Sequence, residues 1–296
     1  NFSSGNEGII YSLTWSPGNL NCIACGTGKK GIFVWDITQS RVVSRYLEHG
    51  SSPVYCVTWN RKDSQLLAST CGGGLCIVRN IDGKMIQKYK HPQAVYGCDW
   101  SPHNRDMIAT SCEDKNIRIF YITASTGQPL RIFKGHTAKS FHVRWSSLRE
   151  GYLCSGSDDT TVRLWDYSED ECAGVLEGHT GPVRGLLWNP EIPYILLSGS
   201  WDYTIKVWDT RGLSCLETVF NHGADVYGLA CHPHRPFLIA STSRDSTVRL
   251  WSMSTLAQPI SLSILAQRPH DEIFAKNIDD AVNSKNVPLL AGQHSK

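Results

Sequence analysis

The stretch GHTGPVRGLLWNPEIPYILLSGSWDYTIKVWD, residues 178–209, decides the fold. Runs rich in Val, Ile and Leu at residues 183–188, 194–198 and 204–208 alternate in it with turn residues, and Gly199 to Tyr203 separates the last two. Short runs of this kind, bounded by Gly, Ser, Asp and Pro, predict antiparallel strands joined by tight hairpins. A further run at residues 215–220 completes a unit of four strands.

This unit is one copy of a repeat, because tryptophan or a replacement for it recurs in two columns that lie 20 residues apart. The first column holds Trp15, Trp59, Trp100, Trp145, Trp188 and Cys231. The second column holds Trp35, Arg79, Phe120, Trp165, Trp208 and Trp251. Successive members are 44, 41, 45, 43 and 43 residues apart in both columns. A four-stranded unit cannot bury both of its faces alone, so the repeat predicts sheets stacked around an axis.

The pairs Gly135-His136, Gly178-His179, Trp165-Asp166 and Trp208-Asp209 resemble the WD-repeat (WD40) family. The resemblance implies an all-β propeller of four-stranded antiparallel blades. We expect a loop at residues 1–8, the propeller at 9–267, and a partly helical tail at 268–296 that leads into further sequence. Six repeats are visible, which leaves open whether six sheets close the ring or a seventh lies outside this sequence. Residues 200–209 and 225–229 also resemble one individual member of the family.

Composition excludes several classes of protein. The 296 residues are 41% hydrophobic and 19% charged, which suits a folded core. The net charge of +2 predicts no attraction to nucleic acid or to an anionic membrane. No stretch is apolar over the roughly 18 residues of a membrane span, and the first residues do not read as a signal peptide. We therefore expect an intracellular protein, most simply a cytoplasmic and alternatively a ciliary one.

The eleven cysteines favour reduced, buried thiols, because their number is odd and they lie within apolar runs. Cys22 and Cys25 form a C-x-x-C motif, but on a strand two residues three apart face opposite sides. No second pair follows at zinc-finger spacing. We expect no metal and no cofactor.

In the WD-repeat family, a histidine, a hydroxyl residue, a hairpin aspartate and the second-column tryptophan form a hydrogen-bonded network. The resemblance places this structural network in repeats four to six, on His136, His179, His222, Ser155, Ser198, Ser241, Asp159, Asp202, Asp245, Trp165, Trp208 and Trp251. The same three polar residue types form hydrolase triads. A catalytic site occurs once in a chain, whereas this set recurs three times at one spacing, so we expect no catalytic residues. Repeats one and two depart from the pattern at Lys29, Gly73 and Arg79.

The resemblance also implies which residues line the channel mouth on the face that binds partners. One set consists of the residues that lie four positions before each first-column member, namely Tyr11, Tyr55, Tyr96, Phe141, Arg184 and Tyr227. Those preceding the hairpin aspartate include Glu113, Asp158, Trp201 and Arg244. An aromatic collar beside Glu113 and Asp158 could hold an Arg or Lys of a peptide. The alternative is that the rings simply plug the channel.

Trp201 is the most distinctive of the ten tryptophans. The nine others fill the two columns and are expected in the propeller core, whereas a hairpin does not require tryptophan before its aspartate. We therefore expect a non-enzymatic scaffold that binds a protein or peptide on this face, with no nucleic acid, membrane or small-molecule substrate. Two alternatives stay open. One is a structural subunit of a coat-like or ciliary assembly, and the other is an enzyme or nucleic-acid binder.

Overall fold

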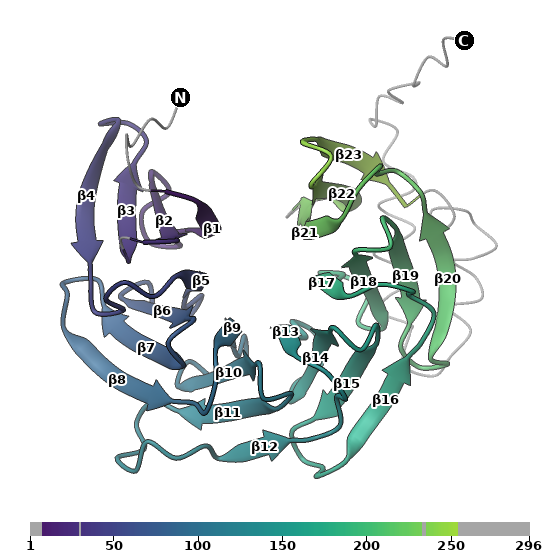
Figure 1. Ribbon diagram of the computed structural model, residues 1–296, viewed down its shortest axis with the longest axis horizontal. Coiled ribbons are helices and arrows are strands. Elements are labelled where there is room, and N and C mark those ends of the chain that lie inside the picture. Colours follow the sequence, from purple (N-terminus) through teal and green to yellow (C-terminus); the bar gives the residue numbers. More distant parts are fainter. Residues whose placement is uncertain (1–7, 30, 233–234, 254–296) are drawn as a thin grey trace.

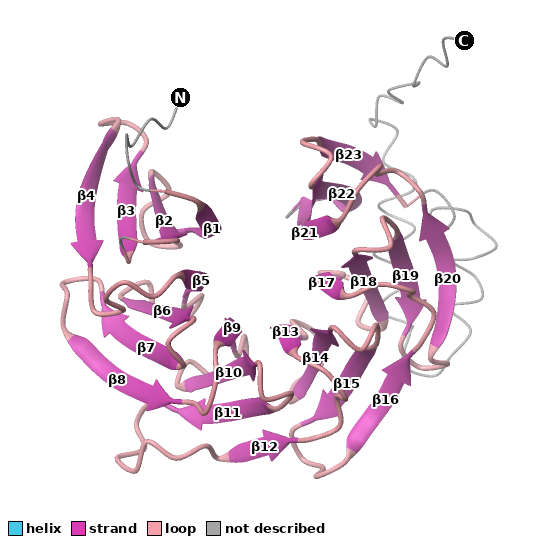
Figure 2. Cartoon of the chain, in the orientation of Figure 1, coloured by secondary structure: helices cyan, strands magenta, loops and turns pink. Residues whose placement is uncertain are grey.

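The computed structural model describes residues 8–29, 31–232 and 235–253. Within them the chain forms antiparallel strands joined by loops (Figure 2). The first three sheets are β1(Ile10–Trp15) to β4(Arg41–Tyr46), with β2(Cys22–Thr27) and β3(Ile32–Asp36); β5(Val54–Trp59) to β8(Met85–Lys90), with β6(Leu66–Cys71) and β7(Leu75–Asn80); and β9(Val95–Trp100) to β12(Arg131–Phe133), with β10(Met107–Cys112) and β11(Ile117–Tyr121).

The other three sheets continue in the same order. They are β13(Ser140–Trp145) to β16(Cys172–Leu176), with β14(Tyr152–Ser157) and β15(Val162–Asp166); β17(Val183–Trp188) to β20(Ser214–Val219), with β18(Ile195–Ser200) and β19(Ile205–Asp209); and β21(Val226–His232), β22(Arg235–Ser243) and β23(Val248–Ser252). Each sheet is a meander of sequential strands, and the sixth has three strands within the described residues.

The sheets stand as blades around a centre, with β1, β5, β9, β13, β17 and β21 innermost (Figure 1). The predicted β-propeller of antiparallel blades is therefore confirmed. Among the described residues no ladder joins the first blade to the sixth, and these two blades flank an open side of the ring. The six repeats visible in the sequence thus form six blades. The expected N-terminal loop and helical tail lie almost wholly outside the described residues.

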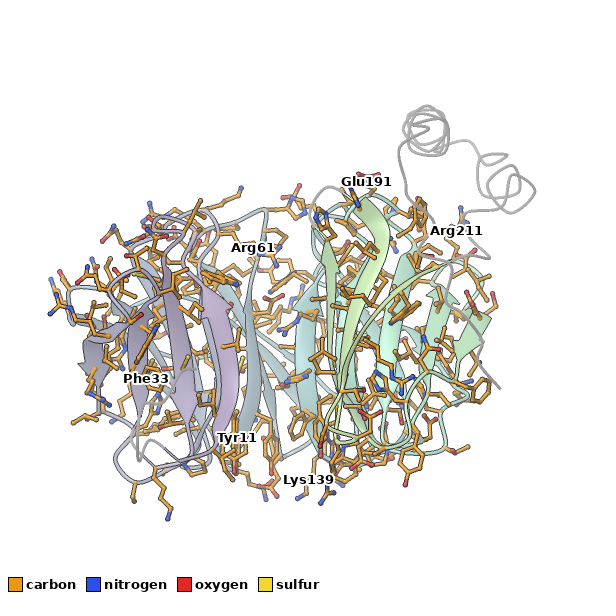
Figure 3. The ribbon with its side chains drawn as sticks, turned by 90° about the horizontal axis from the view of Figure 1, so that it is seen from above. Tyr11, Phe33, Arg61, Lys139, Glu191 and Arg211 are labelled. Carbon is orange, nitrogen blue, oxygen red and sulfur yellow. The ribbon has the colours of Figure 1, made fainter. Side chains whose placement is uncertain are left out.

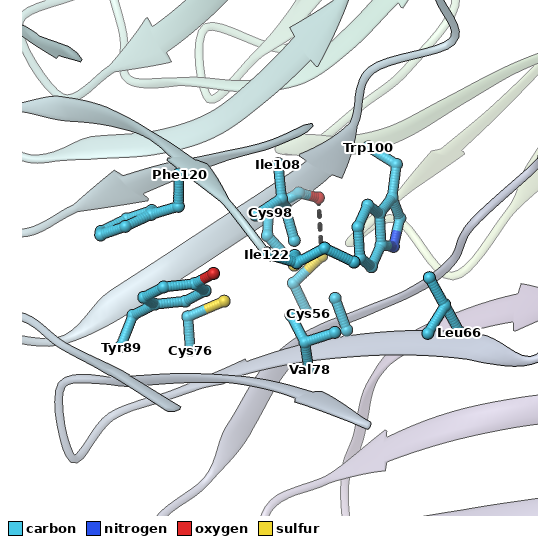
Figure 4. Packing of buried hydrophobic residues seen from close by; sticks show 11 residues of the cluster. Cys56, Leu66, Cys76, Val78, Tyr89, Cys98, Trp100, Ile108, Phe120 and Ile122 are labelled. Atoms are coloured by element: carbon cyan, nitrogen blue, oxygen red, sulfur yellow. Dashed lines mark hydrogen bonds between the residues drawn. The ribbon is translucent and has the colours of Figure 1, made fainter. Parts of the chain in front are cut away.

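The hydrophobic core lies between neighbouring blades. Figure 4 shows one layer, in which Val78 and Cys56 of blade two pack against Trp100 and Phe120 of blade three. The second strands of blades one to five, β2, β6, β10, β14 and β18, are buried at every position. A strand that is covered on both faces carries apolar or small residues at every position, which is why these segments do not alternate.

The first-column tryptophans of blades three to five bind each of these blades to the preceding one, whereas the buried Nε1 of Trp59 has no partner. The indole Nε1 of Trp100 donates to the carbonyl of Thr58 at 3.2 Å. Trp145 and Trp188 donate in the same way to Asp99 and Arg144, each at 3.1 Å. In each case the acceptor is the residue before the first-column tryptophan of the preceding blade. Trp59, Trp100, Trp145 and Trp188 are 3–6% exposed.

Trp15 departs from this rule. Its side chain is 51% exposed, although it occupies the same column as four buried tryptophans. The expectation that all nine column tryptophans lie in the core is wrong at this position, because no described blade packs against the face of blade one that carries Trp15.

All eleven cysteines are free thiols, and eight of them are buried. Cys22 and Cys25 are both buried on β2, and burial raises the pKa of the Cys25 thiol to about 11. The expectation of burial fails at three positions, since Cys172 and Cys231 are half-buried and Cys215 lies exposed on the outer strand β20.

Candidate partner-binding face

The propeller has two faces, which we name after residues labelled in Figure 3. The Tyr11 face carries the hairpins between second and third strands, and Lys139 lies on it as well. The Arg61 face carries the hairpins between first and second strands. Each hairpin of the Tyr11 face contains a residue with left-handed backbone near its end, with φ between 67° and 74°. These residues are Gly31, Gly74, Lys115, Thr160, Tyr203 and Ser246.

Blade five shows how the hairpin that presents Trp201 is fixed. His179 lies between Asp202 and Ser198, with its Nδ1 2.7 Å from Asp202 Oδ2 and its Nε2 2.7 Å from Ser198 Oγ. The indole of Trp208 donates to the same Ser198 hydroxyl at 2.7 Å. Asp202 also accepts the backbone N–H of Thr204 at 2.9 Å, which closes the turn. Every buried polar group of the set is thus paired.

Blades four and six repeat the arrangement. His136 lies 2.8 Å from Asp159 and 2.7 Å from Ser155, and Trp165 donates to that serine at 2.8 Å. In blade six the corresponding distances are 2.8 Å for His222 to Asp245, 2.7 Å for His222 to Ser241, and 3.1 Å for Trp251 to Ser241.

The aspartates of this network are held as carboxylates. Burial alone would raise the pKa of Asp202. The hydrogen bond and charge of His179, together with the hydrogen bond from the Thr204 hydroxyl, lower it by more, so the pKa of Asp202 lies below its ordinary value. Asp159 behaves in the same way beside His136 and Thr161. Each carboxylate therefore keeps its acceptor role at neutral pH.

We expect Asp202→Ala to lower the free energy of unfolding by about 1–3 kcal/mol, because Nδ1 of the buried His179 loses its acceptor. Chemical denaturation with an unchanged m-value would measure this loss. Asp82→Ala is the control, since Asp82 lies in the turn between β7 and β8, where its side chain accepts the Lys84 backbone N–H and has no histidine partner. Equal stability of the wild type and Asp202→Ala would contradict the structural role of the network.

Blades two and three use different pairings. His49 bonds Ser69 at 2.7 Å, but Gly73 replaces the aspartate and the histidine Nδ1 has no partner. In blade three Asp114 forms two hydrogen bonds with Arg118, while the Nδ1 of His91 has no partner. Asp114 stands where blades four to six carry the network aspartate, but Arg118, four residues further on, takes its carboxylate.

The aromatic residues of the Tyr11 face touch one another around the channel mouth. The ring centroids of Tyr11 and Tyr55 are 5.3 Å apart, those of Tyr55 and Tyr96 are 5.1 Å apart, and those of Tyr96 and Phe141 are 4.8 Å apart. On the far side Trp201 meets Tyr227 at 6.1 Å. Offset and edge-to-face contacts at these distances are favourable.

Arg184 connects the two groups of rings. Its guanidinium lies 4.1 Å from the Phe141 ring centroid and 4.3 Å from that of Trp201, and it pairs with Asp158 at 2.6 Å. Arg184 is only 3% exposed. Sequence reasoning placed this residue at the face without predicting that it fills the space between two aromatic rings. The signal was available, because a lone cation stands in a column of aromatic residues.

The two carboxylates expected to hold a partner's cation are already paired within the chain. Asp158 binds Arg184, and Glu113 binds Lys139 at 3.0 Å. Arg244 reaches Asp225 at 3.4 Å and keeps 73% of its side chain exposed. This face therefore exposes the rings of Trp201, Tyr203, Tyr227 and Tyr11 and the Arg244 guanidinium.

The channel also contains a cavity of about 530 Å³, lined in part by Thr14, Thr58, Asp99 and Arg144. Asp99 and Arg144 approach one another at 4.0 Å, and Asp99 accepts the backbone N–H of Trp145 at 2.9 Å. Within the described ranges, no group of three or more His, Cys, Asp and Glu side chains could hold a metal ion. Those ranges also contain no helix long and apolar enough to cross a membrane.

Fold and site together define a repeat β-propeller with one aromatic face. The family model described as "WD domain, G-beta repeat" matches residues 83–120, 127–166, 170–209 and 213–252. The chain belongs to the WD40 family. Its suspected resemblance to one individual member is not confirmed.

Three curated relatives illustrate what the chain is similar to. Histone acetyltransferase type B subunit 2 of Gibberella zeae is 38% identical over 97 residues, which are 30% of this chain and 22% of the relative. Protein transport protein SEC31 of Yarrowia lipolytica is 23% identical over 175 residues, 57% of this chain and 15% of the relative. Guanine nucleotide-binding protein subunit beta of Zea mays is 30% identical over 178 residues, 55% of this chain and 45% of the relative. The matches span less than half of each relative's length.

Proposed function

We propose that this propeller is an interaction scaffold that binds a protein or peptide partner on its Tyr11 face. The observation that carries the proposal is the chain of contacting rings and one guanidinium that runs around the channel mouth from Tyr11 to Tyr227. Aromatic residues and arginine are the residue types that dominate binding energy in protein interfaces.

Exposure supports a binding role over a plug. Trp201, Tyr227 and Tyr11 are 37%, 38% and 48% exposed, although each also contacts a ring or a guanidinium of the collar. A rigid aromatic group that is half-covered by its own fold loses little conformational entropy on binding. Tyr203, in the Trp201 hairpin, adds a further ring that is 49% exposed.

The chemistry of the partner follows from the ion pairs. Because Glu113 and Asp158 are satisfied by Lys139 and Arg184, the collar offers no unpaired carboxylate to an incoming cation. The proposed partner segment therefore presents apolar or aromatic side chains to the rings. An acidic group beside them would suit Arg244, whose guanidinium is the most open charge near Tyr227.

Affinity purification with Trp201→Ala and Tyr96→Ala tests the proposal. We expect the partners recovered with the wild type to be depleted at least tenfold with Trp201→Ala, since losing a central aromatic contact costs about 2 kcal/mol or more. Leu20→Ala is the matched control, because Leu20 is 77% exposed in a hairpin of the opposite face. An undiminished partner set for both face variants would refute binding through this face.

The similarity to SEC31 favours a second candidate, a structural subunit of a coat-like assembly. In that role the blade rims and sequence outside the propeller make the contacts. Partners retained by Trp201→Ala and lost after substitution on the outer strands β4, β8 or β20 would support it. The comparisons give no support for a ciliary location, and we do not retain it.

We further propose that the chain is not an enzyme and uses no cofactor. The His, Ser and Asp side chains form the same buried set in three blades, where they serve the indole of the third strand. The near-neutral composition likewise favours a protein partner over nucleic acid, a membrane or a small-molecule substrate. An intracellular location fits the free thiols.

A further inference from the structure

We infer that the half of the central channel next to the Arg61 face is a second binding site, which takes an acidic peptide segment. This segment belongs to a partner other than the one proposed for the Tyr11 face. The site is the channel cavity of about 530 Å³. Ligand pockets usually measure about 300–1,000 Å³, so the cavity is large enough for part of a peptide.

The cavity lies at the end of the channel that is opposite the aromatic collar. Its walls come from the carboxyl ends of first strands, such as Thr58 on β5 and Arg144 on β13, and from hairpin residues that follow them, such as Arg61. Figure 3 shows the Arg61 and Tyr11 labels on opposite faces of the propeller. Neither Trp201 nor Tyr227 lines the cavity. A ligand in it would therefore leave the exposed rings of the Tyr11 face free.

The charged side chains that line the cavity are Arg61, Asp99 and Arg144. Two guanidinium groups and one carboxylate leave a formal excess of one positive charge. The three residues come from the hairpin between β5 and β6, from β9 and from β13, in three consecutive blades. These blades lie away from the open side of the ring (Figure 1). The wall as a whole is therefore complementary to an anion.

Arg144 is only partly neutralised by the chain. Its Nη1 lies 4.0 Å from Asp99 Oδ1, beyond hydrogen-bond distance, while Oδ2 of Asp99 accepts the backbone N–H of Trp145. Within the described residues, the guanidinium forms one hydrogen bond, from Nη1 to the Val143 carbonyl at 3.3 Å. A guanidinium has five N–H donors, so most of those of Arg144 remain available. Arg184, the other arginine late to be paired on a first strand, differs, because it binds a carboxylate at 2.6 Å.

Arg61 provides a second cation at the mouth of the cavity. It is exposed and forms no hydrogen bond or ion pair within the described part of the chain. Arg105, in the next hairpin of the same face, instead reaches Asp63 and Asp106 at 3.3 Å each. The Thr58 hydroxyl on the cavity wall likewise has no hydrogen-bond partner among the described residues. Two guanidinium groups and a hydroxyl thus have donors to offer to a ligand.

Carboxylates suit this wall better than phosphate groups. A guanidinium binds a carboxylate through two parallel N–H···O bonds. A phosphate monoester carries a charge of about −1.5 to −2 at pH 7, and beside Arg144 it would be repelled by the Asp99 carboxylate. Arg144 lies on a strand inside the channel and Arg61 in a hairpin at its mouth, so an elongated ligand with two successive carboxylates could meet both. A peptide segment with neighbouring Asp or Glu residues has this form.

Isothermal titration calorimetry with a peptide Gly-Asp-Glu-Asp-Gly tests the inference. The reference peptide carries Asn and Gln in place of Asp and Glu. We expect only the acidic peptide to bind, and its affinity to fall as NaCl is raised from about 0.05 to 0.3 M. Arg61→Gln and Arg144→Gln should each weaken binding about tenfold, because each removes a hydrogen bond between charged groups. Arg105→Gln is the matched control, since this arginine of the same face does not line the cavity and should not affect binding.

Equal binding of the acidic and the reference peptide would overturn the inference, because charge would then not be recognised. Wild-type affinity in Arg61→Gln would also overturn it, and this exposed hairpin variant keeps the test decisive if Arg144→Gln does not fold. Succinate or inorganic phosphate that binds as tightly as the acidic peptide would assign the cavity to a small free anion instead. Trp201→Ala should bind the acidic peptide as the wild type does, so failure here and failure of the proposed function are distinguishable.

Discussion

Glu48→Gln should lower the free energy of unfolding by about 3 kcal/mol, although Glu48 lies at the surface. Glu48 is the counter-charge of Arg79, whose side chain is completely buried in the second-column position of blade two. The guanidinium also lies 4.6 Å from the Tyr46 ring centroid, but its Nε and one terminal nitrogen have no partner. Removing one member of a buried ion pair leaves an uncompensated charge, which typically costs 3–5 kcal/mol. Partial exposure of the carboxylate places the expected loss at the lower end of that range.

A double-mutant cycle separates this effect from a general loss at Glu48. Arg79→Trp restores the residue type that donates to a serine in blades four to six, and Ser69 stands at the equivalent position beside His49. We expect Arg79→Trp to match or exceed the wild type in stability, and Glu48→Gln to have almost no effect in that background. Equal losses in both backgrounds, measured by urea denaturation, would show that Glu48 does not act through Arg79.

The free energy of unfolding should fall as the pH is lowered from about 6.5 towards 4. This loss begins at a higher pH than protonation of carboxylates alone would cause. Burial, helped by the charge of Arg79, lowers the pKa of His49 from 6.5 to about 4. Burial and Arg118 lower the pKa of His91 to about 4 as well. Since the unfolded chain then binds protons more readily than the folded one, the stabilisation is complete above pH 6.5 and is lost as the pH falls towards 4. Each histidine contributes up to about 3 kcal/mol of this change.

The control is the double variant His49→Gln, His91→Gln, which should reduce the slope of the stability curve between pH 6.5 and 4. The remaining slope belongs to His142, because burial and the charge of Arg144 lower its pKa to about 3. The lowered pKa values of Asp159 and Asp202 act in a different window, because their stabilisation is present above pH 3.8 and is lost only below it. A wild-type curve that is flat between pH 6.5 and 4.5 in thermal denaturation would contradict the buried, neutral state of the two histidines.

The sequence was sufficient to predict the blades, because the two columns recur at a nearly constant period and the period fixes both strand number and stacking. It also located the hairpin of Trp201 and the residues of the three networks. These features depend on local spacing, which is directly visible in the chain. Closure of the ring could not be predicted in this way, because it depends on which surfaces the last and first blades meet. Trp15 looks the same in sequence as Trp188 and differs only in what covers it.

The ion pairs on the Tyr11 face could not be predicted from the columns of the repeat either. Glu113 and Asp158 stand in one column, while their partners Lys139 and Arg184 lie in the following blade. Such contacts across blades depend on the rotation between neighbouring sheets, which no spacing within a repeat specifies. Arg118 takes Asp114 from His91 for a similar reason, since two local partners compete for one carboxylate and their geometry decides between them.

Hydrogen–deuterium exchange of the protein bound to the partner recovered with it is the most direct test of the central claim, that the Tyr11 face binds a protein. We expect binding to slow exchange in the hairpin at residues 200–204 and in the segment at residues 220–227, which carries Tyr227. Exchange at residues 16–21 and 146–151, in hairpins of the Arg61 face, should not change. Protection confined to the Arg61 face or to the outer strands, with residues 200–204 unaffected, would contradict the account.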